Sequence, residues 1–229
     1  MQARLIRSRE IASEVRHFEF EAVGVDRLDF VPGQFVSLTA EVEGKPITRA
    51  YSLASAPNGT NRFELCLNRV EGGKLSPRIF AIRPGETIAM SAPLGTFTLR
   101  EPARDSILIA TGTGITPFRA YLQAFLAKGE PQFTLLLGAR YETHLLYRQE
   151  FEAMAQQHPQ FRFWPTLSRP EPTWSGRSGH VQAHLVEAID GRMDVDFYLC
   201  GLAQMVDDVR AMLKDMGFDR KQIRSEKYD

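Results

Sequence analysis

The hydrophobic pattern of this chain changes near residue 100, and this change constrains the fold more than any other feature. Before it, short segments such as 14–20, 35–39 and 63–67 alternate apolar and polar residues between clusters of Pro, Gly and Asn. After it, apolar strand-like runs alternate with helical segments. The 229 residues are enough for two domains of about 100 to 130 residues each. We therefore expect two domains of different class.

The first domain, residues 1–101, is predicted to be an antiparallel sheet closed into a small β-barrel. One segment within it, 74–80, has helical character and follows two glycines. A serine near the start of this helix lies where unsatisfied backbone N–H groups face outward. The segment is therefore placed like an anion-binding site.

The second domain, residues 102–229, is predicted to be an α/β Rossmann-like parallel sheet with crossover helices. The boundary falls in the charged, proline-containing stretch 101–105, which is typical of a linker. Strands are expected at 106–110, 133–137, 161–164 and 196–199, and helices at 117–128, 147–157 and 203–216.

Composition excludes several classes of protein. The 28 basic and 28 acidic residues give zero net charge, which argues against a nucleic-acid binder. Charges are scattered through the first 20 residues and no apolar run approaches ~20 residues, so we expect a cytoplasmic protein without membrane insertion. Two cysteines and five scattered histidines indicate no disulfide scaffold, iron–sulfur cluster or other metal site. The motifs of hydrolases and kinases are missing.

A glycine-containing turn, Gly112-Thr-Gly-Ile-Thr-Pro117, follows an apolar strand and opens a helix. In that position backbone N–H groups can approach a pyrophosphate at the helix N-terminus. Alone, the turn is equally compatible with an ordinary strand-to-helix connection. Its place after the first strand of an α/β unit favours nucleotide binding.

Arg49, Tyr51 and Ser52 bring a cation, a ring and a hydroxyl to one predicted strand, with Arg49 and Tyr51 on the same face. A dinucleotide flavin needs a forked cation for its phosphates and a ring to cover the isoalloxazine. The turn Gly72-Gly-Lys-Leu-Ser76 would suit the same pyrophosphate. Each segment also fits a plain alternative, an edge strand with a solvated arginine and a serine-capped helix.

In order and spacing these motifs resemble the ferredoxin–NADP reductase family over essentially the whole chain. The shared set also includes Pro93-x-Gly-x-Phe97, the pair Cys200-Gly201 and an aromatic near the C-terminus. The resemblance implies FAD on the barrel and a nicotinamide dinucleotide on the parallel-sheet domain.

The resemblance also assigns roles to individual residues. It places FAD on Arg49, Ala50, Tyr51, Ser52, Gly73, Lys74, Leu75 and Ser76, with Arg49 on the pyrophosphate, Tyr51 stacked on the flavin and Ser52 near N5. It places the nicotinamide nucleotide on Thr113, Gly114, Thr116, Pro117, Cys200 and Gly201. The catalytic set is Ser52, Cys200, Glu226 and Tyr228. A buried structural thiol is the alternative for Cys200, and a frayed tail the alternative for Tyr228, because Asp229 follows it.

The choice between NADP and NAD rests on the segment after the third strand of the second domain. Ser168-Arg169 is similar to the pair that binds the 2′-phosphate of NADP in the family, and a hydroxyl plus a guanidinium suits a dianion. Arg177 either assists Arg169 or is solvated. Glu171 lies close in sequence, and an acidic residue at such a site would favour the ribose diol of NAD. These residues favour NADP(H).

The sequence therefore predicts an FAD-dependent NADPH oxidoreductase that exchanges electrons with a one-electron carrier such as ferredoxin or flavodoxin. A second hypothesis is an NADH-dependent reductase component of an oxygenase system. A third is a flavin-binding regulatory subunit without turnover. No feature of the sequence specifies an oligomeric state.

Overall fold

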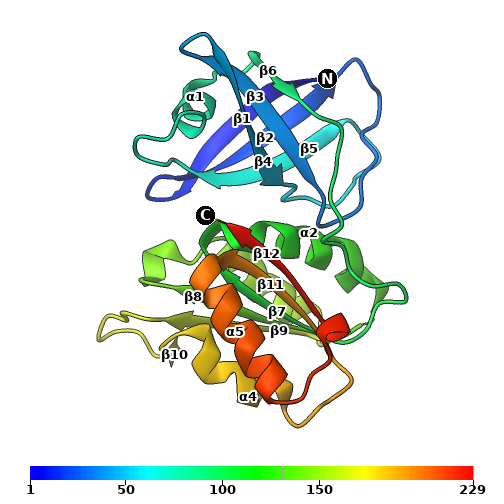
Figure 1. Ribbon diagram of the computed structural model, residues 1–229, viewed down its shortest axis with the longest axis vertical. Coiled ribbons are helices and arrows are strands. Elements are labelled where there is room, and N and C mark those ends of the chain that lie inside the picture. The colour runs from blue at the N-terminus through cyan, green and yellow to red at the C-terminus, as the bar shows by residue number, and fades with distance from the viewer. Residues whose placement is uncertain (130, 229) are drawn as a thin grey trace. The chain divides into compact units, whose positions relative to one another are not determined.

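The computed structural model describes residues 1–129 and 131–228 and divides into two compact units. One unit consists of Met1–Leu99 together with Thr116–Ala124, and the other of Arg100–Ile115 and the chain from Phe125 onward. Each unit is built on one six-stranded sheet (Figure 1). The fold predicted from the sequence, an antiparallel barrel followed by a Rossmann-like parallel sheet, is confirmed.

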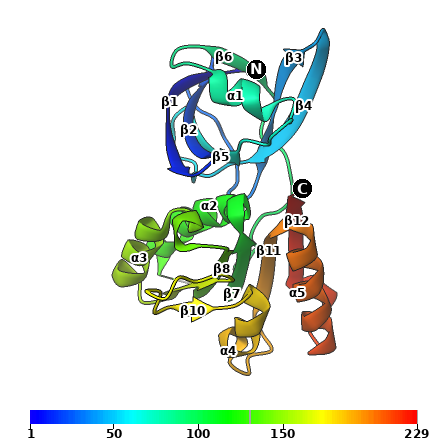
Figure 2. The ribbon, with the colours of Figure 1, turned by 90° about the vertical axis from the view of Figure 1, so that its left-hand side faces the viewer.

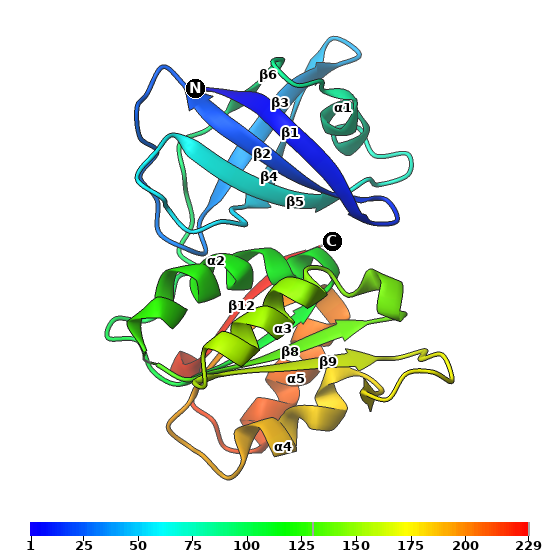
Figure 3. The same cartoon turned by 180° about the vertical axis from the view of Figure 1, so that it is seen from behind.

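The first unit is an antiparallel sheet in the order β4-β3-β6-β1-β2-β5. A bridge between Leu53, the residue after β4, and Leu65 of β5 joins the two edges and closes the sheet on itself. Strands β1, β2 and β5 lie side by side in Figure 3. The strands are β1 (Gln2–Ala12), β2 (Val15–Val23), β3 (Phe35–Val42), β4 (Lys45–Ser52), β5 (Arg62–Asn68) and β6 (Thr87–Met90).

Alternation along the strands creates the core of the barrel. Phe18 and Phe20 of β2 point inward and are fully buried, and Phe20 stacks on Phe63 of β5 at 5.7 Å between ring centroids. Their outward neighbour His17 is also buried, at 3% exposure. The inward rings give the barrel a contiguous apolar interior.

Two helices belong to the barrel unit, α1 (Ser76–Ala81) and most of α2 (Thr116–Phe125). Although α2 follows the first strand of the second sheet in sequence, its polar side chains bond to the barrel. Arg119 donates from Nη1 to the Ala54 carbonyl at 2.7 Å and to Glu64 Oε2 at 2.5 Å. The Tyr121 hydroxyl donates to the Phe97 carbonyl. These contacts hold α2 on the barrel.

The second unit is an all-parallel sheet in the order β10-β9-β8-β7-β11-β12. The chain runs outward from β7 through β8 and β9 and then returns to the other side of β7, as in a doubly wound fold. The strands are β7 (Ser106–Thr111), β8 (Phe133–Ala139), β9 (Phe161–Leu167), β10 (Arg177–Ser178), β11 (Asp196–Leu202) and β12 (Ile223–Tyr228).

Helices cover both faces of this sheet, and α3 (Arg148–Gln157) lies on the opposite side from α5 (Ala203–Asp215) in Figure 2. Phe151 of α3 packs on Phe163 of β9 at 5.4 Å. Val209 and Leu213 of α5 are fully buried in the cluster on the other face. The remaining elements are η1 (Gly112–Ile115), η2 (Leu126–Lys128), η3 (Glu142–His144), η4 (Val181–His184), α4 (Leu185–Ile189) and η5 (Arg220–Gln222).

Several elements differ from the sequence prediction, and neither β10 nor α4 was expected. Strand β12 was not expected, because its sequence, Ile-Arg-Ser-Glu-Lys-Tyr, is polar and it lies at the edge of the sheet. Strand β9 continues past Trp164 to Leu167. The helix predicted over 117–128 ends at Phe125 and continues as a 3-10 turn. Among the described residues, no helix is long and apolar enough to span a bilayer.

Candidate functional site

The carboxyl ends of β7 and β11 mark the point where the parallel sheet reverses its strand order. Strand β7 ends at Thr111 and leads into the η1 turn, and β11 ends at Leu202. The two ends are joined by a hydrogen bond from the Leu202 backbone N–H to Thr111 Oγ1 at 3.1 Å. In open α/β sheets such a switch point is where nucleotides bind. Thr113, Gly114, Cys200 and Gly201, all predicted for nucleotide binding, are brought together here.

The two strand ends pack so closely that glycine is required on both sides. A Cβ on Gly114 would lie 2.3 Å from the Cys200 carbonyl oxygen, and one on Gly201 would lie 2.3 Å from Thr111 Oγ1. Gly201 also has a φ of +137°. Gly112, by contrast, is exposed, has a φ of +55°, and would direct a Cβ into open space. The turn therefore has a tightly packed floor and an open side that leaves room for a ligand.

Thr116 and Pro117 lie one step further along the chain, in the first turn of α2. Both are buried, and Thr116 is 1% exposed. The backbone N–H groups of the first helical turn have no partner within the helix, so a proline there costs no hydrogen bond. Pro117 fits this position, as the sequence suggested.

Cys200, Glu226 and Tyr228 form a cluster on the neighbouring strands β11 and β12. Cys200 is directly opposite Glu226 in the strand register, and Leu202 is opposite Tyr228. The thiol is fully buried, whereas Glu226 and Tyr228 are half-buried. Burial raises the pKa of the Cys200 thiol, Glu226 raises it further, and a side-chain hydrogen bond with Tyr228 opposes the shift. The thiol is therefore protonated at neutral pH.

Burial also raises the pKa of Glu226, to about 7. Because folding favours the protonated carboxyl, its contribution to stability is full below pH ~4.5 and is lost as the pH rises through about 7. The FAD-loaded Glu226→Gln variant should therefore gain melting temperature over wild type, by a few degrees, as the pH is raised from 5 to 8. Calorimetry of both proteins across this range measures the difference, and a difference that is constant with pH would contradict the raised pKa.

The segment predicted to bind a 2′-phosphate follows β9 directly, and Arg169 is exposed. The Ser168 backbone N–H donates to the Ala139 carbonyl at 2.9 Å, and the Arg169 N–H donates to the Arg140 carbonyl at 3.0 Å. Arg140 was not selected from the sequence. These bonds place Arg140 and Arg169 at the ends of adjacent strands. No carboxylate pairs with either guanidinium among the described residues, so both charges are open to an anion.

Arg177, the third candidate for this phosphate, is engaged elsewhere. It lies in β10, and its guanidinium carbon is 3.9 Å from the centroid of the Trp164 ring. Its two terminal nitrogens donate to the carboxylate of Glu187. The structure therefore brings Ser168 and Arg169 together with Arg140, but not with the Arg177 guanidinium.

In the barrel unit, the predicted flavin residues follow one another along β4. Arg49 and Ala50 are exposed, Tyr51 is half-buried and Ser52 is buried at the end of the strand. Arg49 donates to the Thr48 carbonyl at 2.8 Å and has no carboxylate partner among the described residues. Burial raises the pKa of the Tyr51 phenol to about 12, against the opposing charge of Arg49. Tyr51 is therefore a neutral ring beside an unneutralised cation.

The turn before α1 is held by Ser76. Its hydroxyl oxygen accepts a hydrogen bond from the Val70 backbone N–H at 2.9 Å, and the Gly73 N–H donates to the Val70 carbonyl. A Cβ on Gly73 would lie 2.9 Å from that carbonyl oxygen. Lys74 is exposed, and Leu75 is buried. Because the Ser76 hydroxyl accepts this bond, its own proton can be donated to a further group. Together with the exposed Lys74 ammonium, it would fit a phosphate group.

One cluster of ligand-type side chains was not anticipated. His17, Glu19 and Glu64 on the outer face of the barrel have ligand atoms within 4.8 Å of one another. However, Arg7 Nε donates to Glu19 at 2.7 Å and Arg119 Nη1 donates to Glu64 at 2.5 Å. The two arginines neutralise both carboxylates. The cluster therefore offers no net negative charge that would attract a metal cation.

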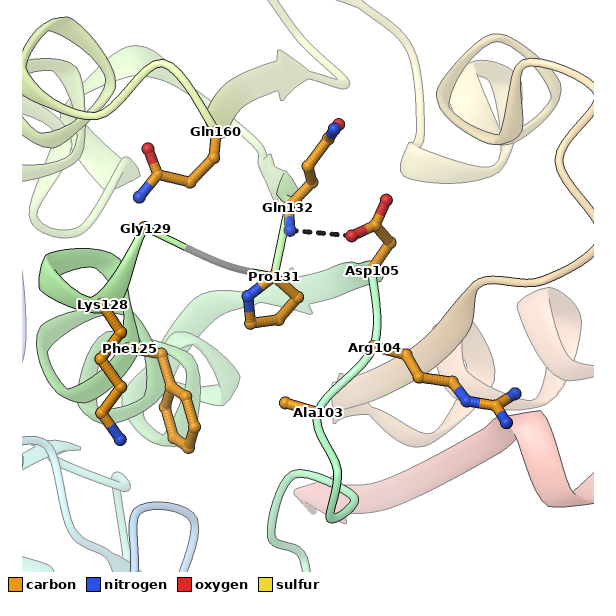
Figure 4. A pocket seen from close by; sticks show the side chains of 9 residues that line it. All are labelled: Ala103, Arg104, Asp105, Phe125, Lys128, Gly129, Pro131, Gln132 and Gln160. Atoms are coloured by element: carbon orange, nitrogen blue, oxygen red, sulfur yellow. Dashed lines mark hydrogen bonds between the residues drawn. The ribbon is translucent and has the colours of Figure 1, made fainter.

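A cavity of about 670 Å³ lies in the second unit (Figure 4). It is at the amino ends of β7 and β8, the edge of the sheet opposite the switch point. Asp105 accepts a hydrogen bond from the Gln132 N–H, and the Lys128 ammonium lies over the Phe125 ring at 4.3 Å. Gln160 Nε2 donates to the Leu126 carbonyl at 2.7 Å. The residues predicted to bind the nucleotide lie at the other edge of the sheet.

The site geometry defines a class of protein: an antiparallel barrel with an open forked cation, and a parallel sheet with a nucleotide-type switch point. Residues 2–99 match the Oxidoreductase FAD-binding domain family, and residues 108–211 match the Oxidoreductase NAD-binding domain family. The chain is 40% identical to ferredoxin–NADP reductase B of Sorangium cellulosum, covering all of this chain and 97% of that protein.

Two further comparisons agree. The anthranilate 1,2-dioxygenase electron transfer component of Acinetobacter baylyi is 31% identical over 89% of this chain, which spans 60% of that protein. A Neisseria gonorrhoeae ferredoxin NADP+ reductase crystallised with FAD and NADP has the same fold, with a TM-score of 0.85, 23% identity and 99% and 98% of the two chains covered. The chain belongs to the ferredoxin–NADP reductase family of flavin- and nicotinamide-nucleotide-dependent oxidoreductases.

Proposed function

We propose that this enzyme oxidises NADPH, holds FAD on its barrel and passes electrons singly to a small carrier such as a ferredoxin or flavodoxin. The observation that carries the choice of NADPH is the pair of unneutralised guanidinium groups, Arg140 and Arg169, beside Ser168. A 2′-phosphate is a dianion that gains from both charges, whereas the ribose diol of NADH does not. The similarity to ferredoxin–NADP reductase B over the whole chain supports the same choice.

For FAD we propose Arg49, Gly73, Lys74, Leu75 and Ser76 as the pyrophosphate site, and Ala50, Tyr51 and Ser52 as the site of the ring. Bound FAD would supply the conversion between a hydride and single electrons. Tyr51 would offer a ring face, and its raised pKa keeps the phenol neutral throughout the physiological range. The buried Ser52 hydroxyl would orient the polar edge of the ring.

For the nicotinamide nucleotide we propose Thr113, Gly114, Thr116, Pro117, Cys200 and Gly201. Cys200 would contact the nicotinamide ring with a neutral thiol, because its pKa is raised and a thiolate is not formed at neutral pH. Glu226 would hold a proton at its carboxyl oxygens near pH 7, beside the thiol and Tyr228. These residues position the ring and exclude water rather than act as a nucleophile.

Along the chain we propose residues 1–101 as the FAD domain and residues 102–229 as the NADP(H) domain. Within the second stretch, Thr116–Ala124 packs in the compact barrel unit. We propose a cytoplasmic location, because the two cysteines are free, buried thiols that suit a reducing compartment.

An alternative is an NADH-dependent reductase of an oxygenase system, which the similarity to the anthranilate dioxygenase component favours. The Arg169→Ala variant decides between them. With NADPH its kcat/KM should fall about 10- to 100-fold, the value of a hydrogen bond to a charged group, and with NADH it should change less than about threefold. Steady-state kinetics with both nucleotides measures the ratio. Equal losses, or no loss with NADPH, would favour the NADH-dependent enzyme.

A further inference from the structure

We propose that Glu187 holds Arg177 away from the 2′-phosphate site and thereby limits the preference of this enzyme for NADPH. The proposal rests on the proposed function, because it concerns the same phosphate. It makes Glu187, which lies on α4 and does not belong to the switch point, a specificity-determining residue.

The direction of the Arg177 side chain is the first observation. Arg177 is paired with Thr166 in the register of β10 and β9, and Gly179 N–H donates to the Leu167 carbonyl at 2.8 Å. The backbone of β10 thus runs beside the end of β9, just before Ser168. The guanidinium nevertheless lies over Trp164, two residues before Thr166. The described contacts therefore hold the side chain against the Trp164 ring, and none of them joins it to Ser168.

Two contacts fix this direction. Arg177 Nη1 donates to Glu187 Oε2 at 2.6 Å and Nη2 donates to Oε1 at 2.8 Å, a bidentate pair. The Trp164 ring covers one face of the guanidinium. The hydrogen bonds from Arg177 lower the pKa of Glu187, so the carboxylate stays charged at neutral pH.

The ion pair between Arg177 and Glu187 is weak enough for Arg177 to exchange it for a phosphate. The Arg177 and Glu187 side chains are 28% and 57% exposed, and an ion pair this exposed contributes little because solvent and salt screen the charges. Ser168 lies two strand residues beyond Thr166, or ~7 Å, which is within the reach of an arginine side chain. NADPH would gain a third cation if Arg177 were released, whereas NADH has no phosphate there to gain from it. Glu187 therefore weakens the binding of NADPH and leaves the binding of NADH unchanged.

The test is the affinity of the FAD-loaded protein for 2′,5′-ADP and for 5′-AMP, measured by titration calorimetry, in wild type, Glu187→Gln and Glu187→Gln/Arg177→Ala. Glu187→Gln should bind 2′,5′-ADP about two- to fivefold more tightly, and its affinity for 5′-AMP should not change. The double variant should lose this gain. Glu187→Ala lacks the amide that the Gln variant could still use to bind Arg177. It should behave like Glu187→Gln.

Glu21→Gln serves as the matched control, because Glu21 forms an exposed ion pair with Arg4 at 2.8 Å in the barrel. It should leave both affinities unchanged. The proposed role of Glu187 would be overturned if the gain in affinity for 2′,5′-ADP persisted without Arg177. It would also be overturned if Glu187→Gln showed no gain while wild type still preferred 2′,5′-ADP. Neither result would affect the assignment of NADPH. If wild type and Glu187→Gln both bind 2′,5′-ADP no better than 5′-AMP, the assignment of NADPH fails as well.

Discussion

Replacement of Gly114 with alanine is expected to slow reduction of the bound flavin by NADPH about 100-fold while FAD stays bound. The added Cβ would lie 2.3 Å from the Cys200 carbonyl oxygen, 2.5 Å from its carbon and 2.6 Å from the Gly201 nitrogen. All three are backbone atoms of β11, so no side chain can rotate away. Either η1 or the end of β11 must move, and a displacement of about 1 Å can cost ~100-fold in rate.

The loss is measured as the flavin-reduction rate of Gly114→Ala at saturating NADPH, together with its flavin content. Gly191→Ala is the matched control, because Gly191 lies in the same unit and a Cβ there would have no atom within 4 Å. That variant carries only the strain of its φ of +69°, about 1–2 kcal/mol, and should reduce its flavin at the wild-type rate. A normal rate in Gly114→Ala would show that the close packing of the switch point is not needed for function.

Cys200→Ala is expected to lower the rate of flavin reduction by about 10- to 100-fold, because the proposed contact with the nicotinamide ring is lost. Its flavin content should not change, since the proposed FAD residues lie on β4 and in the turn before α1. The measurement is anaerobic single-turnover reduction by NADPH, followed by the flavin absorbance.

Cys66→Ala provides the control for the loss of a buried thiol as such. Cys66 is also free and 5% exposed, but it lies on β5 of the barrel. Both variants should lose some stability from the cavity that remains. Only Cys200→Ala should lose its rate. Similar rates in the two variants would mean that Cys200 is a structural thiol, the alternative that the sequence left open.

The two-domain fold could be predicted because its signals are local. Alternation in segments such as 63–67 indicates barrel strands, and the run from Ser106 to Ala110 followed by a glycine turn indicates a parallel sheet. Strand β12 could not be predicted, because its residues form a strand only by pairing with β11 at the sheet edge. The assignment of Thr116–Ala124 to the barrel unit depends on Arg119 reaching Glu64, a contact between distant parts of the sequence.

The candidate site likewise combines features that local sequence motifs indicate with features that only the fold creates. Cys200 and Gly114 could be selected from their motifs, but their close packing depends on the order of the strands. Arg140 had a usable signal, since it follows the second strand of the parallel sheet, where residues that distinguish the nucleotide ribose are found. Arg177 was selected by its charge alone, and no sequence pattern indicates that Trp164 and Glu187 hold its guanidinium.

We propose above all that the chain transfers a hydride from NADPH to its own FAD, and this claim can be tested. Anaerobic stopped-flow absorbance of the purified wild-type protein, mixed separately with NADPH and with NADH, tests it most directly. We expect rapid bleaching of the long-wavelength flavin band by NADPH and much slower bleaching by NADH. Faster bleaching by NADH would contradict the assignment of Arg140, Ser168 and Arg169 to a 2′-phosphate, and no bleaching by either nucleotide would contradict the claim itself.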